Sequence, residues 1–154
     1  MSKTKTGALI VIERETKLGE IMKTGTIINA DITSELLKNI FFNKAPLHDG
    51  AVIIRDNRIA AAGCFLPLSS NKNLSSELGT RHRAGVGISE ASDALVLIVS
   101  EETGSVSIAA GGLLKRHLSA ATLTTILQNE LVHDTDKEDK LSKIKFWKRK
   151  KSKQ

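Results

Sequence analysis

The sequence predicts a single α/β domain built on a mixed central β-sheet that is flanked by helices. Short, continuous apolar runs typical of buried strands alternate with segments whose apolar residues recur at helical spacing. Other candidate strands are joined by tight polar turns, as in hairpins. Strands interleaved with both helices and hairpins indicate a sheet of mixed direction. With 154 residues and a hydrophobic content of 40%, the chain is long enough for one proper core.

The N-terminal part is expected to begin with an interior strand at 8–12. A helix of one or two turns that ends near Gly25 follows, with apolar residues at Leu18, Ile21 and Met22. Residues 27–28 could form a brief strand. Asp31 is a good N-cap for the next helix. The apolar residues of that helix recur on one face, at Ile32, Leu36, Leu37, Ile40 and Phe41.

Two hairpins and two further helices are predicted in the rest of the chain. The first hairpin pairs 51–54 with 59–65, and the second pairs 94–99 with 106–109, which ends at Gly111 and Gly112. Between them, Thr80 is expected to cap a helix running to about Ala91. Two glycines, Gly85 and Gly87, weaken this helix by roughly 1 kcal/mol each relative to alanine. Ser119 is expected to cap the last helix, whose buried face carries Leu123, Ile126, Leu127 and Leu131.

The positive charge of the chain is concentrated at its C-terminal end. The net charge is +6, but residues 137–154 hold nine Lys or Arg and two acids, whereas residues 1–136 are nearly neutral. We therefore expect a folded domain over residues 1–133 and a basic, disordered tail over residues 134–154.

Several classes of protein and site find no support in the sequence. No apolar run approaches the roughly 18 residues of a membrane span, and the first residues lack the apolar region of a signal peptide. Cys64, the only cysteine, is expected to be a buried small hydrophobe in a cytosolic protein. The chain also lacks a P-loop, a GxGxxG fingerprint and any zinc-type Cys/His spacing.

The triplet His48-Asp49-Gly50 stands directly before the apolar run 51–54. An acid and an imidazole at the mouth of a strand could bind a metal ion or move a proton, and a glycine there lets a ligand come close. The same residues could form a turn with a solvated Asp and His. Taken alone, these residues favour the turn.

A second stretch changes that interpretation. Asp49-Gly50-Ala51 and Arg81-His82-Arg83 resemble the "DGA" and "RHR" motifs of the diadenylate cyclase family. Segments 63–68 and 100–104 also match, and the resemblance covers roughly residues 8–130 in one order. It implies an enzyme that condenses two ATP into cyclic di-AMP plus two pyrophosphates, and a fold with a mixed central sheet covered by helices.

The resemblance implies a metal-dependent reaction centre. Asp49 is expected to take the proton of the attacking 3′-hydroxyl, to hold the metal that lowers the pKa of that hydroxyl, or both. Gly50 and Ala51 would let the ribose approach the strand. The expected ligands of Mg²⁺ or Mn²⁺ are His48, Asp49 and Glu102. Without the family resemblance, Glu101 and Glu102 would be interpreted as acids of a hairpin turn.

The resemblance also implies the substrate contacts. The triphosphate is expected to bind Thr80, Arg81, His82 and Arg83, since guanidinium groups and free N–H groups at a helix start suit phosphate. Successive helical side chains point in different directions, so at least one of the three basic residues is expected to bind elsewhere in the domain. The other expected substrate-binding residues are Phe65 and Leu66 at adenine and Ser100 at a phosphate. Glu101 is also expected at the substrate, and it is the alternative to Glu102 as the acid near the metal.

One set of motifs provides one ATP site, whereas the product needs two nucleotides. We therefore expect a homodimer that forms transiently, face to face across a two-fold axis. Many family members carry this domain behind transmembrane helices. The chain is thus expected on the cytoplasmic side, with a parent protein anchored in the membrane through segments absent here. The family leaves room for a regulatory protein partner, and no nucleic acid is expected.

Two other hypotheses stay open at this point. The first is a nucleotide sensor on the same fold that no longer converts its nucleotide to product. The presence of Asp49 and of Arg81–Arg83 argues against this hypothesis. The second is a protein that binds nucleic acid or a membrane surface through its basic tail. Salt-dependent DNA binding without ATP turnover would favour the second.

Overall fold

The structure, a computed structural model, describes residues 1–132. The chain divides into two compact units, residues 1–117 and residues 118–154. In the second unit, residues 120–132 are helical, and the Ser119 hydroxyl accepts a hydrogen bond from the Thr122 N–H (3.1 Å), which confirms the predicted cap. The expected tail, 134–154, lies outside the described residues.

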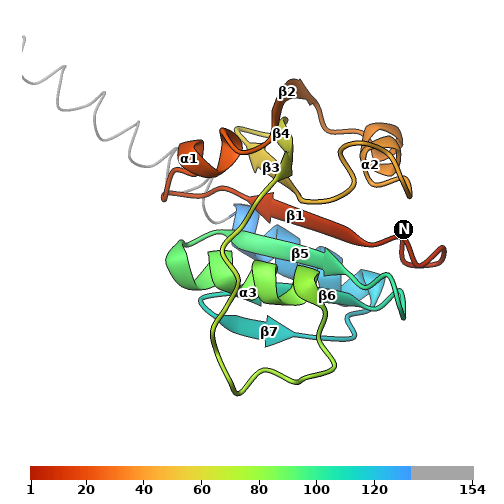
Figure 1. Cartoon of the computed structure of the whole chain (residues 1–154), viewed down its shortest axis with the longest axis vertical. Helices are drawn as coiled ribbons and strands as arrows, with labels where there is room; N and C mark the ends of the chain where they lie inside the picture. Colours follow the sequence, from red (N-terminus) through yellow and green to blue (C-terminus); the bar gives the residue numbers. More distant parts are fainter. Residues whose placement is uncertain (133–154) are drawn as a thin grey trace, which may run out of the picture. The chain divides into compact units, whose positions relative to one another are not determined.

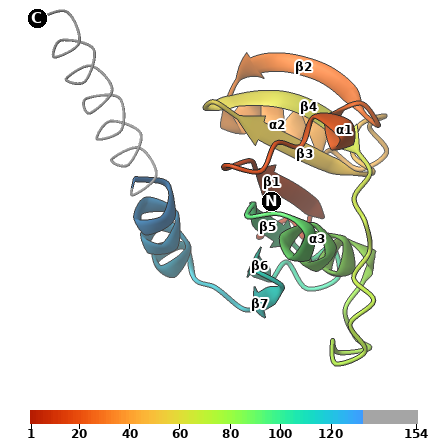
Figure 2. The same cartoon turned by 90° about the vertical axis from the view of Figure 1, so that its left-hand side faces the viewer.

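The first unit is a seven-stranded mixed sheet with the strand order β2-β4-β3-β1-β5-β6-β7, which Figures 1 and 2 both show. The strands are β1 (Ala8–Ile12), β2 (Thr26–Asp31), β3 (Ala51–Arg55), β4 (Arg58–Cys64), β5 (Leu95–Val99), β6 (Val106–Ala110) and β7 (Leu113–Lys115). Only β1 and β3 pair in parallel, and the other neighbours are antiparallel. The predicted α/β fold with a mixed sheet is confirmed.

Side-chain alternation along β1 places a core on each face of the sheet. Leu9 and Val11 join one core with the helices α1 (Gly19–Met22) and α3 (Thr80–Ala91). Ala8 joins the other core, which packs against the end of the helix α2 (Ser34–Ile40). Helices therefore cover both faces, as the sequence predicts.

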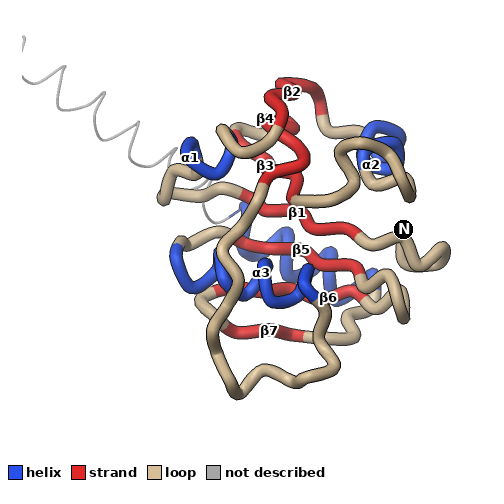
Figure 3. The backbone as a smooth tube through the Cα atoms, in the orientation of Figure 1, coloured by secondary structure: helices blue, strands red, loops and turns tan. Residues whose placement is uncertain are grey.

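Helix α3 is buried on more than one side, which explains why its glycines are tolerated. An added Cβ at Gly85 would meet the Ile98 side chain of β5 at 2.7 Å, so this glycine lets the helix approach the sheet. Gly87 faces the backbone of Pro67 in the loop between β4 and α3, which Figure 3 shows passing along the helix. The Ser69 N–H of that loop donates to the Arg83 carbonyl (3.0 Å). Close packing on both sides thus offsets the low helix propensity.

Two expected helix caps are wrong. Asp31 lies at the end of β2, where it forms an ion pair with Arg58, and the N-cap of α2 is Thr33, whose hydroxyl accepts from the Leu36 N–H (3.1 Å). Strand β2 is accordingly longer than the brief strand predicted at 27–28. The N-cap of α3 is Gly79, and Thr80 is the first helical residue.

The other difference is β7, which the sequence analysis missed. Gly111 and Gly112 do not end the sheet but form a tight turn with positive φ angles, after which the chain returns as β7 against β6. This short strand carries the chain back toward the edge of the sheet where β6 begins.

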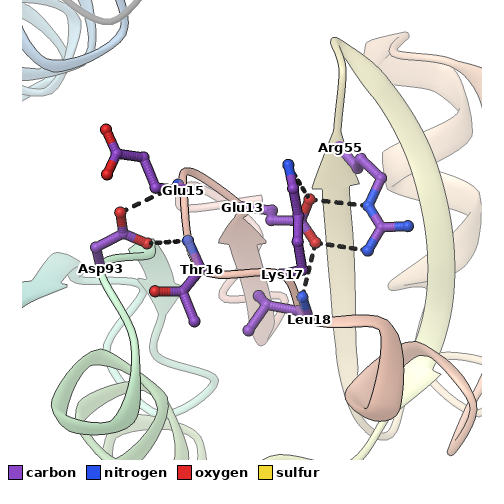
Figure 4. Close-up of polar contacts among 7 residues, drawn as sticks. All are labelled: Glu13, Glu15, Thr16, Lys17, Leu18, Arg55 and Asp93. Carbon is purple, nitrogen blue, oxygen red and sulfur yellow. Dashed lines mark hydrogen bonds and ion pairs between the residues drawn. The ribbon is translucent and has the colours of Figure 1, made fainter.

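The loop after β1 is fixed at the opposite edge of the sheet by an ion pair whose carboxylate is buried (Figure 4). The Glu13 carboxylate, 1% exposed, accepts from the Arg55 guanidinium (2.7 and 2.8 Å) and from the Leu18 N–H (2.8 Å). Asp93 accepts from the backbone N–H groups of Glu15 and Thr16, each at 3.0 Å. Together these carboxylates hold residues 13–18 in place.

Candidate active site

A cavity of about 900 Å³ opens at one edge of the sheet. The strand directions bring together at this edge the starts of β1, β3 and β6 and the ends of β4, β5 and β7. The residues before β3, after β4, at the start of α3 and after β5 all line the cavity. The two motifs, about 30 residues apart in the sequence, therefore meet in one hollow.

Asp49 reaches the cavity because Gly50 allows the chain to pass close to the end of β4. Gly50 has a φ of +127°, and an added Cβ would lie 2.7 Å from the Gly63 carbonyl carbon and 2.9 Å from the Cys64 carbonyl oxygen. No other residue fits both this conformation and this space. Ala51, by contrast, is fully buried in β3 and does not line the cavity.

The ring of His48 is oriented by a backbone carbonyl. Its Nδ1 lies 2.7 Å from the Ala45 oxygen. A carbonyl can only accept a hydrogen bond, so Nδ1 carries the proton, and in the neutral imidazole Nε2 keeps its lone pair. His48 lines the cavity and has an acceptor or ligand nitrogen left over.

Arg81 is held between a glycine and an acid. Its guanidinium nitrogen Nη1 lies 3.1 Å from Oε2 of Glu101, and its side chain is 20% exposed. The guanidinium also packs against Gly7, the residue before β1: an added Cβ there would lie 2.7 Å from Cζ. Arg81 thus enters the cavity from the start of α3 in a fixed position.

The N-terminus of α3 itself faces this cavity. Gly79, Thr80, Arg81 and His82 all line it. Gly79 has no side chain to cap the helix, so the first N–H groups are left without a side-chain acceptor. Such N–H groups suit an anion, and α3 is long enough to add its dipole.

His82 is 93% buried beside the cavity, with an exposed fraction of 7%. Burial lowers the pKa of its imidazole, and the positive charge of Arg116 lowers this pKa further, against a smaller opposing effect of Glu102. His82 is therefore mainly neutral near pH 7.

Arg83 points away from this cavity. Its guanidinium Nη2 lies 3.5 Å from the Ser75 carbonyl in the loop before α3, and it is not among the residues lining the cavity. Of the three basic residues in the RHR motif, two reach the cavity and the third contacts the adjoining loop.

The turn after β5 is organised by Ser100. Its hydroxyl oxygen accepts from the N–H groups of Glu102 (3.2 Å) and Thr103 (3.3 Å). The hydroxyl proton stays available to a cavity ligand, since a hydroxyl has one donor besides its two acceptor lone pairs. This turn places Glu101 and Glu102 at the cavity.

The end of β4 supplies the apolar part of the lining. Phe65 is 65% exposed, which a ligand surface explains better than a core position does, and Leu66 is half-buried against the main core. Cys64 behind them is buried, as expected, and burial raises the pKa of its thiol to about 11.

Two charged lining residues were missed by the sequence analysis. Glu77 comes from the loop before α3, and Arg116 follows β7. The run Lys115-Arg116-His117 has no motif of its own, and only the missed strand β7 would have placed it at this edge.

A metal ion fits this site only in part. Within residues 1–132 no three His, Cys, Asp or Glu side chains are gathered as a metal-binding cluster. The expected ligands His48, Asp49 and Glu102 line the same cavity without forming such a cluster. Their carboxylates and free imidazole nitrogen suit a hard divalent cation that takes most of its ligands from water and nucleotide phosphates, as Mg²⁺ commonly does.

Comparison with known proteins supports one family. Residues 1–114 match the DAC family, described as DisA bacterial checkpoint controller nucleotide-binding. The chain is 51% identical over 152 residues to the cyclic di-AMP synthase CdaA of Bacillus subtilis, covering 99% of the chain and 55% of that protein. It is 52% identical over 137 residues to a diadenylate cyclase of Listeria monocytogenes, covering 89% of this chain and 50% of that protein. The chain thus spans about half the length of these relatives.

Solved structures agree with the sequence relatives. A crystal structure of a double-cysteine mutant of DacA from Staphylococcus aureus matches with a TM-score of 0.83 and 49% identity, over 84% of this chain and 86% of that one. A structure titled as a hypothetical membrane spanning protein from Bacillus cereus matches with a TM-score of 0.74 and 50% identity, over 77% of this chain and 58% of that one. In the present chain, no helix among residues 1–132 is long and apolar enough to cross a membrane.

Proposed function

This chain belongs to the DAC family of diadenylate cyclases, and on that premise we propose that it condenses two ATP molecules into cyclic di-AMP and releases two pyrophosphates. The observation that carries the proposal is the meeting of Asp49 and Arg81 in one cavity. An acid that can accept a proton and a fixed guanidinium are two of the groups that such a transfer needs.

In this proposal Asp49 receives the proton of the attacking 3′-hydroxyl. Gly50 lines the cavity without a side chain, which leaves room for the ribose beside Asp49, whereas Ala51 packs into the core behind it. General-base assistance of this kind is worth about 10²–10⁴-fold in rate. Phe65 and Leu66, at the end of β4, offer the apolar surface on which adenine would lie.

The phosphates are proposed to bind at the start of α3 and at the turn after β5. The first N–H groups of α3, the Arg81 guanidinium and the Ser100 hydroxyl are donors that face the cavity. Arg81, which now pairs with Glu101, would then exchange this carboxylate for an incoming phosphate. Arg83 is proposed to support the loop before α3 and not to touch the nucleotide.

We further propose that the reaction depends on Mg²⁺ or Mn²⁺. A divalent cation would neutralise phosphate charge and lower the pKa of the attacking hydroxyl. Asp49, Glu102 and His48, through its free Nε2, would hold it.

Catalysis is proposed to need two copies of the chain, face to face. One chain brings one set of motif residues to one cavity, whereas the product joins two nucleotides symmetrically. We also propose that the parent protein is attached to the membrane, with this domain on the cytoplasmic side where ATP is available. A relative titled as membrane spanning supports this.

The direct test is to incubate the purified chain with ATP and either Mg²⁺ or Mn²⁺ and to identify the products by mass. We expect cyclic di-AMP with two equivalents of pyrophosphate. ATP that binds but is recovered unchanged under all metal conditions would contradict the proposal and indicate a nucleotide sensor.

A further inference from the structure

The described residues that line the cavity carry more carboxylates than guanidinium groups. Among residues 1–132, its lining includes four carboxylates, Asp49, Glu77, Glu101 and Glu102, and two guanidinium groups, Arg81 and Arg116. A triphosphate is itself strongly anionic, so the cavity needs cationic partners at the phosphate end. Divalent cations can supply part of this positive charge, and the two arginines are the candidates for supplying the rest.

The two arginines differ in their present partners. Arg81 forms an ion pair with Glu101, whereas Arg116 is exposed and has no hydrogen bond or ion pair with any residue in the part of the chain that the structure describes. Arg83 does not contribute, because it lies outside the cavity. Of these two lining arginines, Arg116 is therefore the one that can pair with an anion without first giving up a carboxylate.

Local structure fixes where Arg116 lies. It follows β7 directly, one residue beyond the pair of Lys115 with Ile108. The next residue, His117, has a φ of +57°, and its Nδ1 lies 3.0 Å from the Ser105 hydroxyl at the start of β6. The backbone around Arg116 is thus tied on both sides to the edge where the cavity opens.

The order of the strands separates the ends of the cavity. Phe65, Leu66 and Asp49 lie at β4 and β3, while Arg116 lies at β7, four strands further along from β3. At about 4.8 Å per strand this separation is on the order of 19 Å. The apolar surface and the proposed base are at one end, and the Arg116 guanidinium is at the other, with Arg81 and Ser100 between them.

We propose that Arg116 binds the β- and γ-phosphates of ATP and stabilises the pyrophosphate that leaves. This inference rests on the proposed cyclase function and adds a residue to its machinery. In each half-reaction the 3′-oxygen forms a bond to the α-phosphorus. The bond from that phosphorus to the oxygen that bridges the α- and β-phosphates breaks. The hydroxyl proton goes to Asp49, and the electron pair of the broken bond goes to pyrophosphate, whose added negative charge lies where Arg116 can pair with it.

The test compares Arg116→Gln, Arg116→Lys and the matched control Lys115→Gln, which removes the same charge one residue away but outside the cavity. Direct binding of ATP, inorganic pyrophosphate and AMP is measured with Mg²⁺ present. For Arg116→Gln we expect about 10- to 100-fold weaker binding of ATP and pyrophosphate, with AMP changed by less than about twofold. Arg116→Lys should restore part of the loss, and Lys115→Gln should bind like the wild type.

Pyrophosphate binding needs no turnover, so it tests Arg116 separately from the cyclase activity. Unchanged ATP and pyrophosphate binding in Arg116→Gln, equal weakening of ATP and AMP, or the same loss in Lys115→Gln would overturn the inference. A wild-type chain that binds no pyrophosphate would also overturn it. A wild type that binds ATP and pyrophosphate through Arg116 but forms no cyclic di-AMP would overturn only the proposed function.

Discussion

The guanidinium of Arg81 lies directly against Gly7, so closely that a Cβ at position 7 would be 2.7 Å from its Cζ. Gly7 precedes β1 and Arg81 lies in the first turn of α3, so this contact joins two segments that are more than 70 residues apart in the sequence. Glu101 holds the guanidinium through the ion pair at 3.1 Å. The position from which Arg81 is proposed to bind phosphate thus depends on a glycine outside both motifs.

The first prediction concerns this contact. Gly7→Ala should displace the Arg81 guanidinium, because the end of a long side chain moves more easily than the backbone. We expect the KM for ATP to rise several-fold while the melting temperature changes by only a few degrees. Gly19→Ala is the matched control, since its added Cβ would meet nothing nearer than 4.0 Å. An unchanged KM in Gly7→Ala would show that Arg81 does not depend on this packing.

The second prediction separates the two arginines of the RHR motif. Arg81→Ala should weaken ATP binding about 10- to 100-fold while adenosine binding stays nearly unchanged, because the lost contact is to phosphate. Arg83→Ala, which removes a contact to the Ser75 carbonyl, should leave the ratio of ATP to adenosine affinity as it is in the wild type. Equal weakening of both ligands by Arg81→Ala would indicate a structural role for that residue.

The third prediction concerns the proposed base. Asp49→Asn keeps the shape of the side chain but removes its charge and its basic oxygen. We expect cyclic di-AMP synthesis to be lost while ATP still binds, as measured by product mass and by direct binding. Turnover of this variant at the wild-type rate would refute the role of Asp49.

The fold was predictable where local patterns decide it. The apolar runs of β1, β3 and β5 and the turn residues of both hairpins carry their own signals. The cap of α2 was not, because Asp31 and Thr33 are both good N-caps, and the pairing of β2 with β4 decides between them. Strand β7 is only three residues long, and its pairing with β6 cannot be seen in its sequence.

The site was predictable to the extent that motifs define it. Asp49, His48, Arg81 and the turn after β5 do line one cavity. Burial of Ala51 and the outward course of Arg83 follow from packing against β4 and the loop before α3, which no motif encodes. Arg116 was missed for a related reason, since its place depends on β7.

The fourth prediction concerns stability at low pH. Burial raises the pKa of Glu13, but the Arg55 and Leu18 hydrogen bonds and the charges of Arg55 and Lys17 outweigh it, so the pKa of this carboxyl is lowered from 4.5. A lowered pKa means that the ionised carboxylate stabilises the fold above the unfolded-state pKa, and that this contribution disappears as the pH falls through the folded-state pKa.

Glu13→Gln should therefore lower the free energy of unfolding by about 1–3 kcal/mol at pH 7, through loss of charged hydrogen bonds inside the fold. The difference from the wild type should shrink steadily below about pH 4.5. Thermal melts of both proteins between pH 3 and pH 8 test this prediction. Glu20→Gln, which removes an exposed partner of Lys23, is the control and should change little. A Glu13 effect that is constant over this range would mean that the ionised carboxylate is not what stabilises the loop.

The last prediction concerns assembly. If two chains must face each other, activity per chain should rise with protein concentration in the dilute range, because the active species is the pair. Mixing Asp49→Asn chains into the wild type should lower activity more than simple dilution does, since a mixed pair can complete only one of the two bonds. The control is an equal amount of Lys115→Gln chains, which keep every proposed catalytic group. Constant activity per chain down to concentrations where the protein is monomeric by light scattering would rule out the two-chain mechanism, because a single cavity would then be joining both nucleotides.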